Sequence, residues 1–423
     1  MSTVRFLHCA DLHLDTPFRG LAHIAPDVAE ALNNATFRAY DNVIDLAIEE
    51  QVDCVIVAGD VYESSDRSLR AQFRFRDGLQ RLSDHGIAAF VAFGNHDPLR
   101  EWTKSVNLEW PKLTHVFGSR RVDNCPLTRG GEVVASVHGI SFGKPAVTED
   151  LAAQFEAPHD GAPSIAVLHA NVGGDTGHDN YAPTTVAELA EKGFDYWALG
   201  HVHAHRILRE NAPAIVYPGC SQSRQPNETG AKGCCLVTLS DGHVPAVHFV
   251  PIDVVRFHQG AVDVSACDSI DAVRRAVVEH CDTAQATAED RSLVVRLSLT
   301  GRTSVSRELR RGGNLADLTQ NLREALLPRI PWILLERLTV DTRGAYDIET
   351  LATQQDFSGD IVREYTSLLS EDNPLLEQVQ DDIEVDLRTS PAWKLLTPPS
   401  RTELRHLAER AMHETLDLTV GED

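Results

Sequence analysis

The sequence of 423 residues contains no apolar run near the roughly 18 residues that a membrane-spanning helix requires. Its first residues, from Met1 to Phe6, enter an apolar strand without the charged, apolar and small-residue regions of a signal peptide. Hydrophobic residues make up 42% of the chain and aromatic residues 6%, which is ordinary for a globular protein. We therefore expect a cytoplasmic protein that does not cross a membrane.

Cysteine is sparse and scattered. The eight cysteines include no Cys-x-x-Cys pair and form no dense framework. This spacing argues against a disulfide scaffold and against a thiolate zinc site, and it favours buried free thiols.

Positive charge is also in short supply, with 39 lysines and arginines against 62 acidic residues and a net charge of -23. Such a balance argues against a protein that coats nucleic acid by itself. Local basic patches remain open, and the candidates are Arg67, Arg70, Arg74, Arg76 and Arg81, beside Phe73 and Phe75, and Arg302, Arg307, Arg310 and Arg311. For the first group, an ordinary charged helix face is the alternative to a surface that contacts phosphates.

The length suggests two or three domains. Residues 1–240 alternate short apolar runs with helical stretches, which predicts a sheet covered by helices and an α/β class. Residues 241–345 predict a smaller α+β domain, and residues 346–423 a helical region that could dock a partner.

The predicted strands of the first domain are Arg5–His8, Cys54–Ala58, Ala88–Phe93, Glu132–Gly139, Ile165–Leu168, Tyr196–Leu199 and Cys234–Thr238, and its helices are Asp27–Glu50 and Leu69–Leu82. In the second domain we expect strands near Ala246–Phe257, Leu293–Leu299 and Trp332–Thr342, and helices at Ser269–His280 and Ala316–Leu327.

One arrangement recurs five times in the first domain: an apolar strand runs into a turn that opens with potential metal ligands. The five segments are Asp11-Leu12-His13, Gly59-Asp60, Gly94-Asn95-His96-Asp97, His169 and Gly200-His201-Val202-His203. Ligand sites in open α/β sheets gather at the carboxyl ends of strands, so five strand ends can deliver these groups to one crevice. The glycines before Asp60, Asn95 and His201 suit sharp turns.

Each segment alone has a plain structural explanation, because Asp-x-His and Gly-Asp are common in turns and on surfaces. Their conjunction, in this order and after these strands, is what predicts a functional site.

The ordered set resembles the signature of the calcineurin-like metallophosphoesterases. The resemblance covers roughly Met1–Thr238 and implies a metallophosphoesterase sheet sandwich flanked by helices, with the α+β domain as a cap. The stretches His8–Asp15, Tyr196–His203 and Tyr217-Pro218-Gly219 are similar to the nuclease subunit of SbcCD-type DNA repair complexes. Gln225–Gly233 is most similar to the bacterial YhaO-like branch.

The resemblance implies two metal ions. Asp11, His13 and His203 would hold one ion, and Asn95, His169 and His201 the other, with Asp60 as the bridge. Imidazole, carboxylate and amide ligands suit manganese, iron or zinc, and the family's nucleases favour Mn²⁺. Two such ions activate a shared water and clamp the phosphate oxygens during in-line attack.

His96 follows the ligand Asn95 and is the candidate that protonates the departing oxygen, with Asp97 orienting it. Support for Asn95 is the alternative role for His96. Glu63 departs from the pattern, because the best-known nucleases often carry histidine three residues after the bridging aspartate. His178 and Asp179 match a loop of the YhaO-like branch that either flanks the substrate or is solvated.

The resulting hypothesis is a metal-dependent phosphodiesterase that serves as a DNA exonuclease or endonuclease subunit in DNA repair. A phosphohydrolase of small phosphodiesters or nucleotides is the first alternative, and a non-catalytic regulatory subunit the second. The resemblance implies DNA as substrate and an SbcC/YhaN-like coiled-coil ATPase as partner, and it leaves a homodimer open. One predicted helix carries an apolar stripe among acidic residues, formed by Leu375, Leu376, Val379, Ile383 and Leu387. It either docks on the partner, as the resemblance favours, or folds back onto its own catalytic domain.

Overall fold

The computed structural model describes residues 3–16, 26–63, 68–99, 109–157, 161–174, 177, 179–240, 245–370, 373–389 and 399–420. The chain forms two compact units. The first unit comprises Met1–Gln259 and Gln285–Val294, and the second comprises Gly260–Ala284 and Val295–Asp423.

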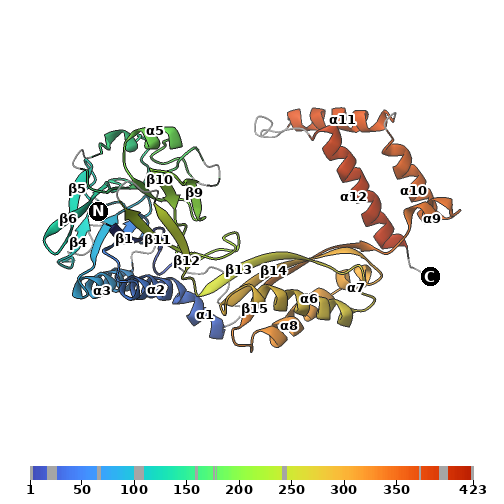
Figure 1. Ribbon diagram of the computed structural model, residues 1–423. Helices are drawn as coiled ribbons and strands as arrows, with labels where there is room; N and C mark the ends of the chain where they lie inside the picture. Colours follow the sequence, from blue (N-terminus) through green and yellow to red (C-terminus); the bar gives the residue numbers. More distant parts are fainter. Residues whose placement is uncertain are drawn as a thin grey trace. The chain divides into compact units, whose positions relative to one another are not determined.

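The first unit contains two six-stranded sheets (Figure 1). The first sheet has the order β12-β11-β1-β2-β3-β4, with β1 (Thr3–Cys9), β2 (Cys54–Ala58), β3 (Ala88–Ala92), β4 (Thr114–Val116), β11 (Gly233–Ser240) and β12 (Ala246–Pro251). The second has the order β5-β6-β7-β8-β10-β9, with β5 (Asp123–Arg129), β6 (Glu132–Gly139), β7 (Ser164–His169), β8 (Tyr196–Gly200), β9 (Arg206–Arg209) and β10 (Ala214–Tyr217). Each sheet contains four parallel strands, β1 to β4 in the first and β6, β7, β8 and β10 in the second.

The central strands are short apolar runs because both of their faces are covered. All five residues of β2 are buried, as are all five of β8. Between the sheets, Phe6, Ile56 and Phe90 of the first pack in one apolar cluster with Val167 and Ala198 of the second. This shared core holds the two sheets face to face.

Helices cover the outer faces. Against the first sheet lie α2 (Ala35–Glu49) and α3 (Leu69–Asp84), which contribute Tyr40 and Phe75 to a second apolar cluster (Figure 1). The short helices η1 (Ala152–Gln154) and α5 (Val186–Glu191) flank the other sheet, where Trp197 packs with Phe155 and Phe194. The predicted α/β class, with two sheets flanked by helices, is confirmed.

The second unit is built around the three-stranded sheet β13-β14-β15 and a set of helices. Its strands are β13 (Val255–Asp263), which begins in the first unit, β14 (Ser292–Thr303) and β15 (Ile333–Gly344). The helices are α6 (Ile270–Ala286), α7 (Ser306–Arg310), α8 (Asn314–Leu326), α9 (Ile348–Thr353), α10 (Phe357–Leu368), α11 (Leu375–Thr389) and α12 (Arg401–Thr419). Residues 346–423 are mainly helical where the structure describes them, as predicted.

Two predicted elements are divided in the structure. The helix expected over Asp27–Glu50 is α1 (Pro26–Asn33) followed by α2, because consecutive asparagines, which favour caps and turns, interrupt the helical run. The strand expected over Ala246–Phe257 is β12 followed by β13. Between them, the Gln222 side chain accepts hydrogen bonds from the amides of Val254 and Val255.

Searched over the described residues, no helix combines the length and the apolar character needed to cross a bilayer. The predicted three-part division at residues 240 and 345 stays a prediction.

Candidate metal centre

The seven predicted ligands lie at the carboxyl ends of five parallel strands. Asp11 and His13 follow β1, Asp60 follows β2, and Asn95 follows β3. His169 is the last residue of β7, and His201 and His203 follow β8. The two packed sheets therefore bring residues that are up to 192 positions apart in the sequence to one place.

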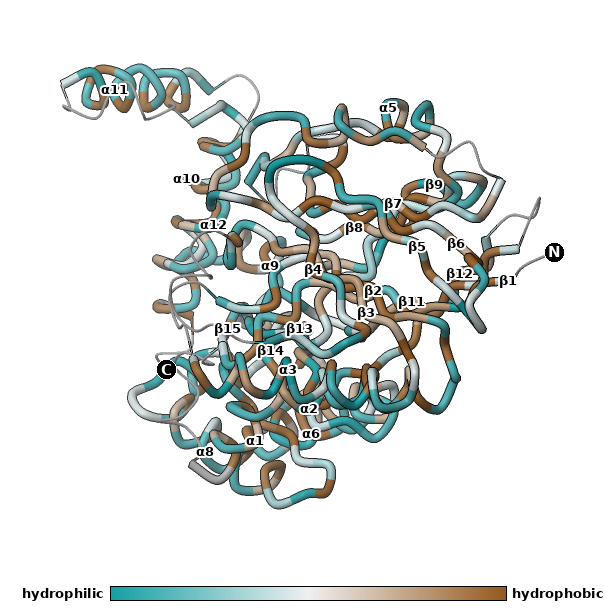
Figure 2. The backbone as a smooth tube through the Cα atoms, turned by 90° about the vertical axis from the view of Figure 1, so that its left-hand side faces the viewer, coloured by the Kyte–Doolittle hydropathy of each residue, from teal (hydrophilic) through white to brown (hydrophobic). Residues whose placement is uncertain are grey.

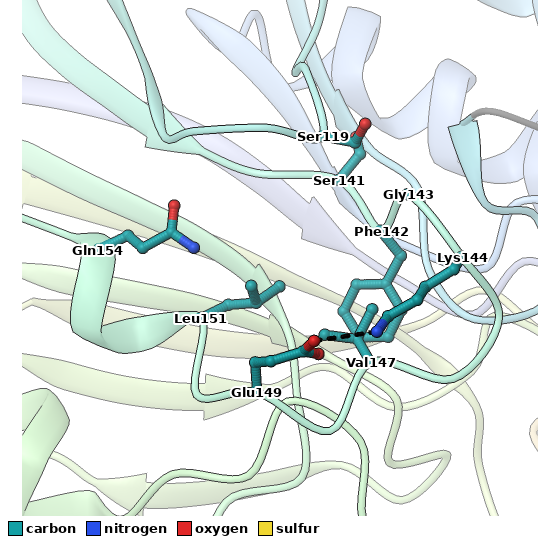
Figure 3. Close-up of a pocket in the computed structure, with 9 residues that line it drawn as sticks. All are labelled: Ser119, Ser141, Phe142, Gly143, Lys144, Val147, Glu149, Leu151 and Gln154. Carbon is teal, nitrogen blue, oxygen red and sulfur yellow. Dashed lines mark hydrogen bonds and ion pairs between the residues drawn. The ribbon is translucent and has the colours of Figure 1, made fainter.

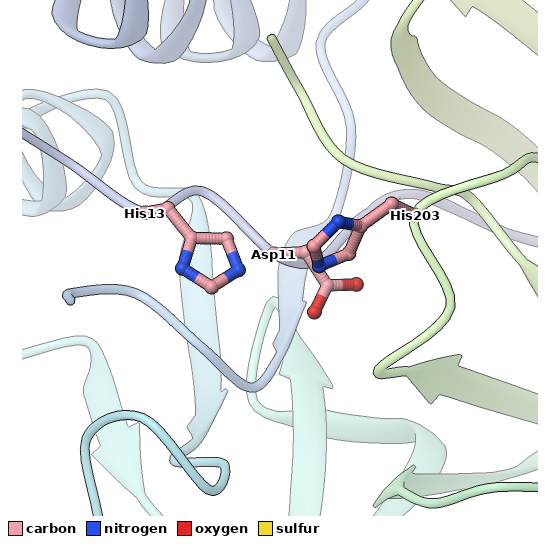
Figure 4. A group of neighbouring side chains, drawn as sticks. All are labelled: Asp11, His13 and His203. Carbon is pink, nitrogen blue, oxygen red and sulfur yellow. The ribbon is translucent and has the colours of Figure 1, made fainter. Parts of the chain in front are cut away.

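The first group consists of Asp11, His13 and His203, whose candidate ligand atoms all lie within 4.8 Å of one another. Figure 4 shows the Asp11 carboxylate just below the His203 imidazole, with the His13 imidazole to the left of both. Both carboxylate oxygens of Asp11 accept from the backbone amide of His201, at 3.2 and 3.1 Å, which fixes the direction of the side chain.

The second group is joined to the first through Asp11. Ligand atoms of Asp11, Asp60 and His169 also lie within 4.8 Å of one another. His169 Nε2 is 3.4 Å from Asp60 Oδ2 and 3.0 Å from Asn95 Oδ1, and its ring centroid is 5.2 Å from that of His201. The structure thus brings together every residue of the predicted set.

Backbone strain concentrates at this site. Four non-glycine ligands have positive φ: Asp11 (51°), His13 (40°), Asp60 (50°) and His201 (100°). Such conformations are uncommon for these residue types and persist where the surroundings enforce them, typically at functional sites. No sequence signal marks this strain, because none of the four positions is glycine.

The glycines that precede three of the ligands are required mainly for space. A Cβ on Gly200 would lie 1.8 Å from the carbonyl oxygen of Ala58, and one on Gly94 would lie 2.2 Å from Asp60 Oδ1. Of these three glycines, only Gly59 also has a positive φ, of 98°. The predicted role in sharp turns therefore applies to Gly59, whereas Gly94 and Gly200 permit close packing around the ligands.

The donor set fits cations. Asp11 and Asp60 are buried carboxylates, and burial of such charge is costly unless an opposite charge compensates it. His13 is fully buried, and neither of its ring nitrogens makes a well-directed hydrogen bond among the described residues, although Nδ1 lies 3.2 Å from Glu63 Oε2. Buried polar atoms normally find partners, and a metal ion would supply one here. Imidazole and carboxylate donors suit borderline transition metals.

The ligands influence one another's protonation strongly. Burial alone lowers the pKa of His169, but the charges of Asp60 and Asp11 outweigh it and raise that pKa to about 9. Burial and the nearby charge of Arg224 lower the pKa of His13 to about 3. The two carboxylates thus favour a proton on His169, and a bound cation would compete with that proton.

His96 is paired with a residue that the sequence did not assign to it. Its Nδ1 donates to Glu63 Oε1 at 2.5 Å. Burial lowers the pKa of His96, but Glu63 and Asp60 together raise it above the ordinary value. Asp97 directs its carboxylate to the backbone amides of Val61, Tyr62 and Gly94, at 2.6, 3.0 and 2.8 Å. The predicted pairing of Asp97 with His96 is therefore replaced: Glu63 contacts the ring, and Asp97 ties the loops after β2 and β3 together.

A second carboxylate, Glu228, contacts the centre and was also missed. It is 8% exposed and accepts from His203 Nδ1 at 2.8 Å. Although burial raises its pKa, the hydrogen bond and charge of His203 and the charge of Arg224 lower it to about 2. In the sequence, Glu228 was visible only as part of the stretch similar to the YhaO-like branch.

A cavity of about 330 Å³ opens at the centre, lined by Asp60, Asn95, His96, Gly177, Asp179, His201 and His203. The carbonyl oxygen of Asp179 accepts from His201 Nε2 at 2.7 Å, so this loop residue contacts a ligand. His178 lies outside the described residues. A separate cavity of about 330 Å³ is bounded by Phe142, Val147 and Leu151 and by the exposed ion pair of Lys144 with Glu149 (Figure 3).

The arginines of α3 are neutralised by nearby acidic or polar groups. Arg74 pairs with Asp41 and Arg81 with Asp45, both of α2, and Arg76 pairs with Asp77. Arg70 contacts Asn34 and lies 3.6 Å from Asp15. Arg67 lies outside the described residues. This pattern favours the ordinary charged helix over the basic patch.

In the second unit, Arg307 and Arg311 line a cavity of about 860 Å³. Arg310 contacts Ser306 and the Thr342 carbonyl, and the Arg302 guanidinium lies over the ring of Tyr346. In this second candidate patch, therefore, Arg307 and Arg311 are the two arginines that line a cavity.

Two known protein families match parts of this chain. Residues 4–205 match the calcineurin-like phosphoesterases, and residues 257–343 match the middle domain of metallophosphoesterase YhaO. The chain therefore carries a calcineurin-like metallophosphoesterase domain followed by a YhaO middle domain, which confirms the resemblance that the motifs indicated.

Three relatives extend the comparison. The chain is 37% identical over 274 residues to the uncharacterized metallophosphoesterase YhaO of Bacillus subtilis, covering 64% of this chain and 66% of the relative. It is 26% identical over 263 residues to the DNA double-strand break repair protein Mre11 of Sulfurisphaera tokodaii, covering 60% and 64%. It is 24% identical over 274 residues to the SbcD component of the nuclease SbcCD of Bacillus subtilis, covering 56% and 67%. The chain thus spans just under two thirds of the length of the first two relatives.

Proposed function

We propose that this chain is a metal-dependent phosphodiesterase that acts on DNA as the nuclease subunit of a repair complex. The observation that carries the proposal is the meeting of seven potential donors in one place, where Asp60, Asn95, His201 and His203 also line a cavity. In this proposal, Asp11, His13 and His203 would hold one divalent ion, Asn95, His169 and His201 would hold the other, and Asp60 would be shared between the two. We favour Mn²⁺, with iron or zinc as alternatives of similar ligand preference.

The bound ions would activate a water molecule and neutralise charge that accumulates on the phosphate. The protein's own contribution is a proton donor. Because His96 Nδ1 is held by Glu63, its Nε2 is the nitrogen left to serve the cavity that His96 lines. A histidine so placed can protonate the departing oxygen, which typically contributes about 10²–10⁴-fold to the rate.

Similarity to Mre11 and to the SbcD component of the SbcCD nuclease supports DNA as the substrate. A second candidate is hydrolysis of small phosphodiesters. It is supported by the net charge of -23 and by the neutralised arginines of α3, since both weaken the attraction of a long polyanion.

We further propose that α11 docks a coiled-coil ATPase. The predicted apolar stripe divides in the structure: Leu376 is buried and Ile383 and Leu387 are half-buried, whereas Leu375 and Val379 are exposed. Figure 2 shows apolar and polar residues alternating along α11. The exposed apolar residues, surrounded by acidic side chains, form the surface that a partner would cover.

The next helix has a different role. Met412 and Leu416 of α12 are buried in a cluster with Leu351, Ile361 and Val362. Because α12 belongs to the core of its own unit, we confine the docking proposal to α11.

One assay separates the two substrate classes. The full-length protein with Mn²⁺ is offered single-stranded DNA, duplex ends and a chromogenic phosphodiester side by side, with the metal-stripped protein as control. We expect metal-dependent cleavage of DNA. Rapid turnover of the small ester without DNA cleavage, also in the presence of the ATPase, would favour the second candidate.

A further inference from the structure

Behind the metal centre lies a chain of three charged side chains that the proposed ligand set does not use: Glu63, Arg224 and Glu228. All three belong to the first unit. Each is largely shielded from solvent, with side-chain exposures of 16%, 12% and 7%. Charged groups at this depth are stable only when their partners are well placed.

Glu63 contacts two imidazole rings, and in both rings the contact is with Nδ1. Its Oε1 accepts from His96 Nδ1 at 2.5 Å, and its Oε2 lies 3.2 Å from His13 Nδ1. His13 Nε2 points the other way, to within 3.8 Å of Asp60 Oδ2. One carboxylate therefore stands behind both a proposed ligand and the proposed proton donor, and the Nε2 atoms are left for the centre.

Glu228 repeats this arrangement at the third imidazole. Its Oε1 accepts from His203 Nδ1 at 2.8 Å, and its Oε2 accepts from the Arg224 amide at 2.6 Å. The Ser223 hydroxyl donates to the Glu228 carbonyl at 2.6 Å, so the segment that presents Glu228 is itself fixed.

Arg224 links the two carboxylates. One terminal nitrogen donates to Glu63 Oε2 at 3.1 Å, and the other lies 3.7 Å from Glu228 Oε1. The guanidinium supplies the positive charge that two shielded carboxylates need and sets the distance between them.

The group His13, Glu63 and His96 is also compact enough to hold a cation. The guanidinium of Arg224, 3.1 Å from Glu63, argues against an ion there, because it already provides the compensating charge. Support of the imidazoles accounts for all of these contacts.

We propose that Glu63, Arg224 and Glu228 are positioning residues that orient His13, His96 and His203 from behind. Ligating histidines are commonly held in this way through the ring nitrogen that does not face the metal, and loss of the partner typically costs about 10–100-fold in metal affinity or activity. The inference rests on the proposed function, and it extends that function to residues outside the ligand signature.

The test uses the full-length chain and the variants Glu63→Gln and Glu228→Gln, which keep size and remove charge. Glu149→Gln, which removes an exposed carboxylate paired with Lys144, is the matched control. The first readout is Mn²⁺ affinity by competition with a chelator, with unfolding of the metal-free proteins measured alongside. We expect both variants to bind Mn²⁺ about 10–100-fold more weakly and the control to match the wild type.

The second readout separates the two carboxylates by the leaving group of the substrate. At saturating Mn²⁺, Glu63→Gln should slow a phosphodiester with an alcohol leaving group about tenfold more than one with a nitrophenolate, because only the alcohol needs the proton of His96. Glu228→Gln should slow both equally.

The outcomes distinguish this inference from the proposed function. Wild-type Mn²⁺ affinity in both variants, with unfolding unchanged, would overturn the inference even in an active phosphodiesterase. Weakened Mn²⁺ binding in a protein that cleaves no phosphodiester would support the positioning role and contradict the function. If Glu63→Gln fails to fold, Arg224→Met replaces it, and unchanged metal affinity in that variant would overturn the positioning role of the three charged residues.

Discussion

At Gly200 the backbone of a neighbouring strand leaves no room for a side chain. A Cβ would meet the Ala58 carbonyl oxygen at 1.8 Å and His169 Nδ1 at 2.9 Å. We expect Gly200→Ala to destabilise the protein by about 1–3 kcal/mol, as overpacked sites do. Because the next residue is the proposed ligand His201, metal content should fall as well.

The control for this substitution is Gly313→Ala. Among the described residues, the nearest atom to a Cβ added there is Asp317 Oδ2, at 3.9 Å, which is an ordinary van der Waals contact. Chemical unfolding and elemental analysis of both variants give the answer. If Gly200→Ala unfolds like the wild type and keeps its metal, the close approach is not a constraint.

Substitution of His96 should separate metal binding from the rate of phosphodiester hydrolysis. Since it is not among the seven proposed ligands, His96→Ala should keep metal near the normal level while turnover falls by about 10²-fold or more. The exposed His85 at the end of α3 offers the matched control His85→Ala. The measurement is kcat on a phosphodiester with a poor leaving group, together with metal content. Full rate in His96→Ala on that substrate would exclude a proton-donor role.

The meeting of the seven proposed ligands was predictable from the sequence because each lies at or just after the end of a buried strand, and parallel strands end at a common edge. The position of Glu63 behind His96 was not, since that pairing depends on the side-chain direction of two loops. Glu228 lies 25 residues beyond His203, in a loop without apolar periodicity, so nothing in its spacing marks it. Positive φ at Asp11 and His201 is likewise a tertiary property.

At the scale of elements, α3 carries several arginines whose charges are balanced by neighbouring acidic side chains. Arg74 and Arg81 form ion pairs with Asp41 and Asp45 of α2. We expect Arg74→Ala and Arg81→Ala to cost about 0–1 kcal/mol each, as exposed ion pairs do. DNA affinity should stay at the wild-type value in a filter-binding or anisotropy titration.

The variants to compare with those of α3 are Arg307→Ala and Arg311→Ala in the second unit. They alter a cavity lined by both arginines. If the α3 substitutions alone lower DNA affinity about tenfold while folding stays intact, α3 does contact DNA.

Substitutions at exposed residues of α11 can test the proposed docking of an ATPase without disturbing the apolar core. Val379 and Val385 are 39% and 59% exposed, whereas Leu376 is buried. Replacing both valines by aspartate should abolish co-purification with a coiled-coil ATPase and leave thermal unfolding and hydrolysis of a small phosphodiester unchanged. Arg388→Ala on the same helix, which removes an exposed pair with Glu384, is the control. Normal ATPase binding by the double variant would remove α11 as the docking surface.

The elements that the sequence predicted well are the fully buried ones. Cys54–Ala58 appears with the predicted bounds because five consecutive buried residues leave one interpretation. The short strands β4, β9 and β10 were missed, since three or four residues carry too little periodicity. The break at Asn34 and the loop between β12 and β13 depend on local polar contacts that periodicity does not report.

At the scale of the whole molecule, the proposed metal ions would join an acidic chain to an anionic substrate. With a net charge of -23, the protein would need the cations both to balance Asp11 and Asp60 and to attract phosphate. Removal of metal by a chelator should therefore lower the melting temperature and abolish turnover, and Mn²⁺ should restore both. Asp60→Ala and His169→Ala should behave like the stripped protein.

The proposed function depends on two ions that share one bridging carboxylate, and the number of metal ions bound per chain tests this arrangement without reference to any substrate. Elemental analysis of the Mn²⁺-saturated protein gives the count, and anomalous diffraction gives the positions. We expect two ions, one beside Asp11 and His203 and one beside Asn95 and His169, with Asp60 between them. A single ion at saturating metal, with Asp60 uncoordinated, would contradict the two-metal centre.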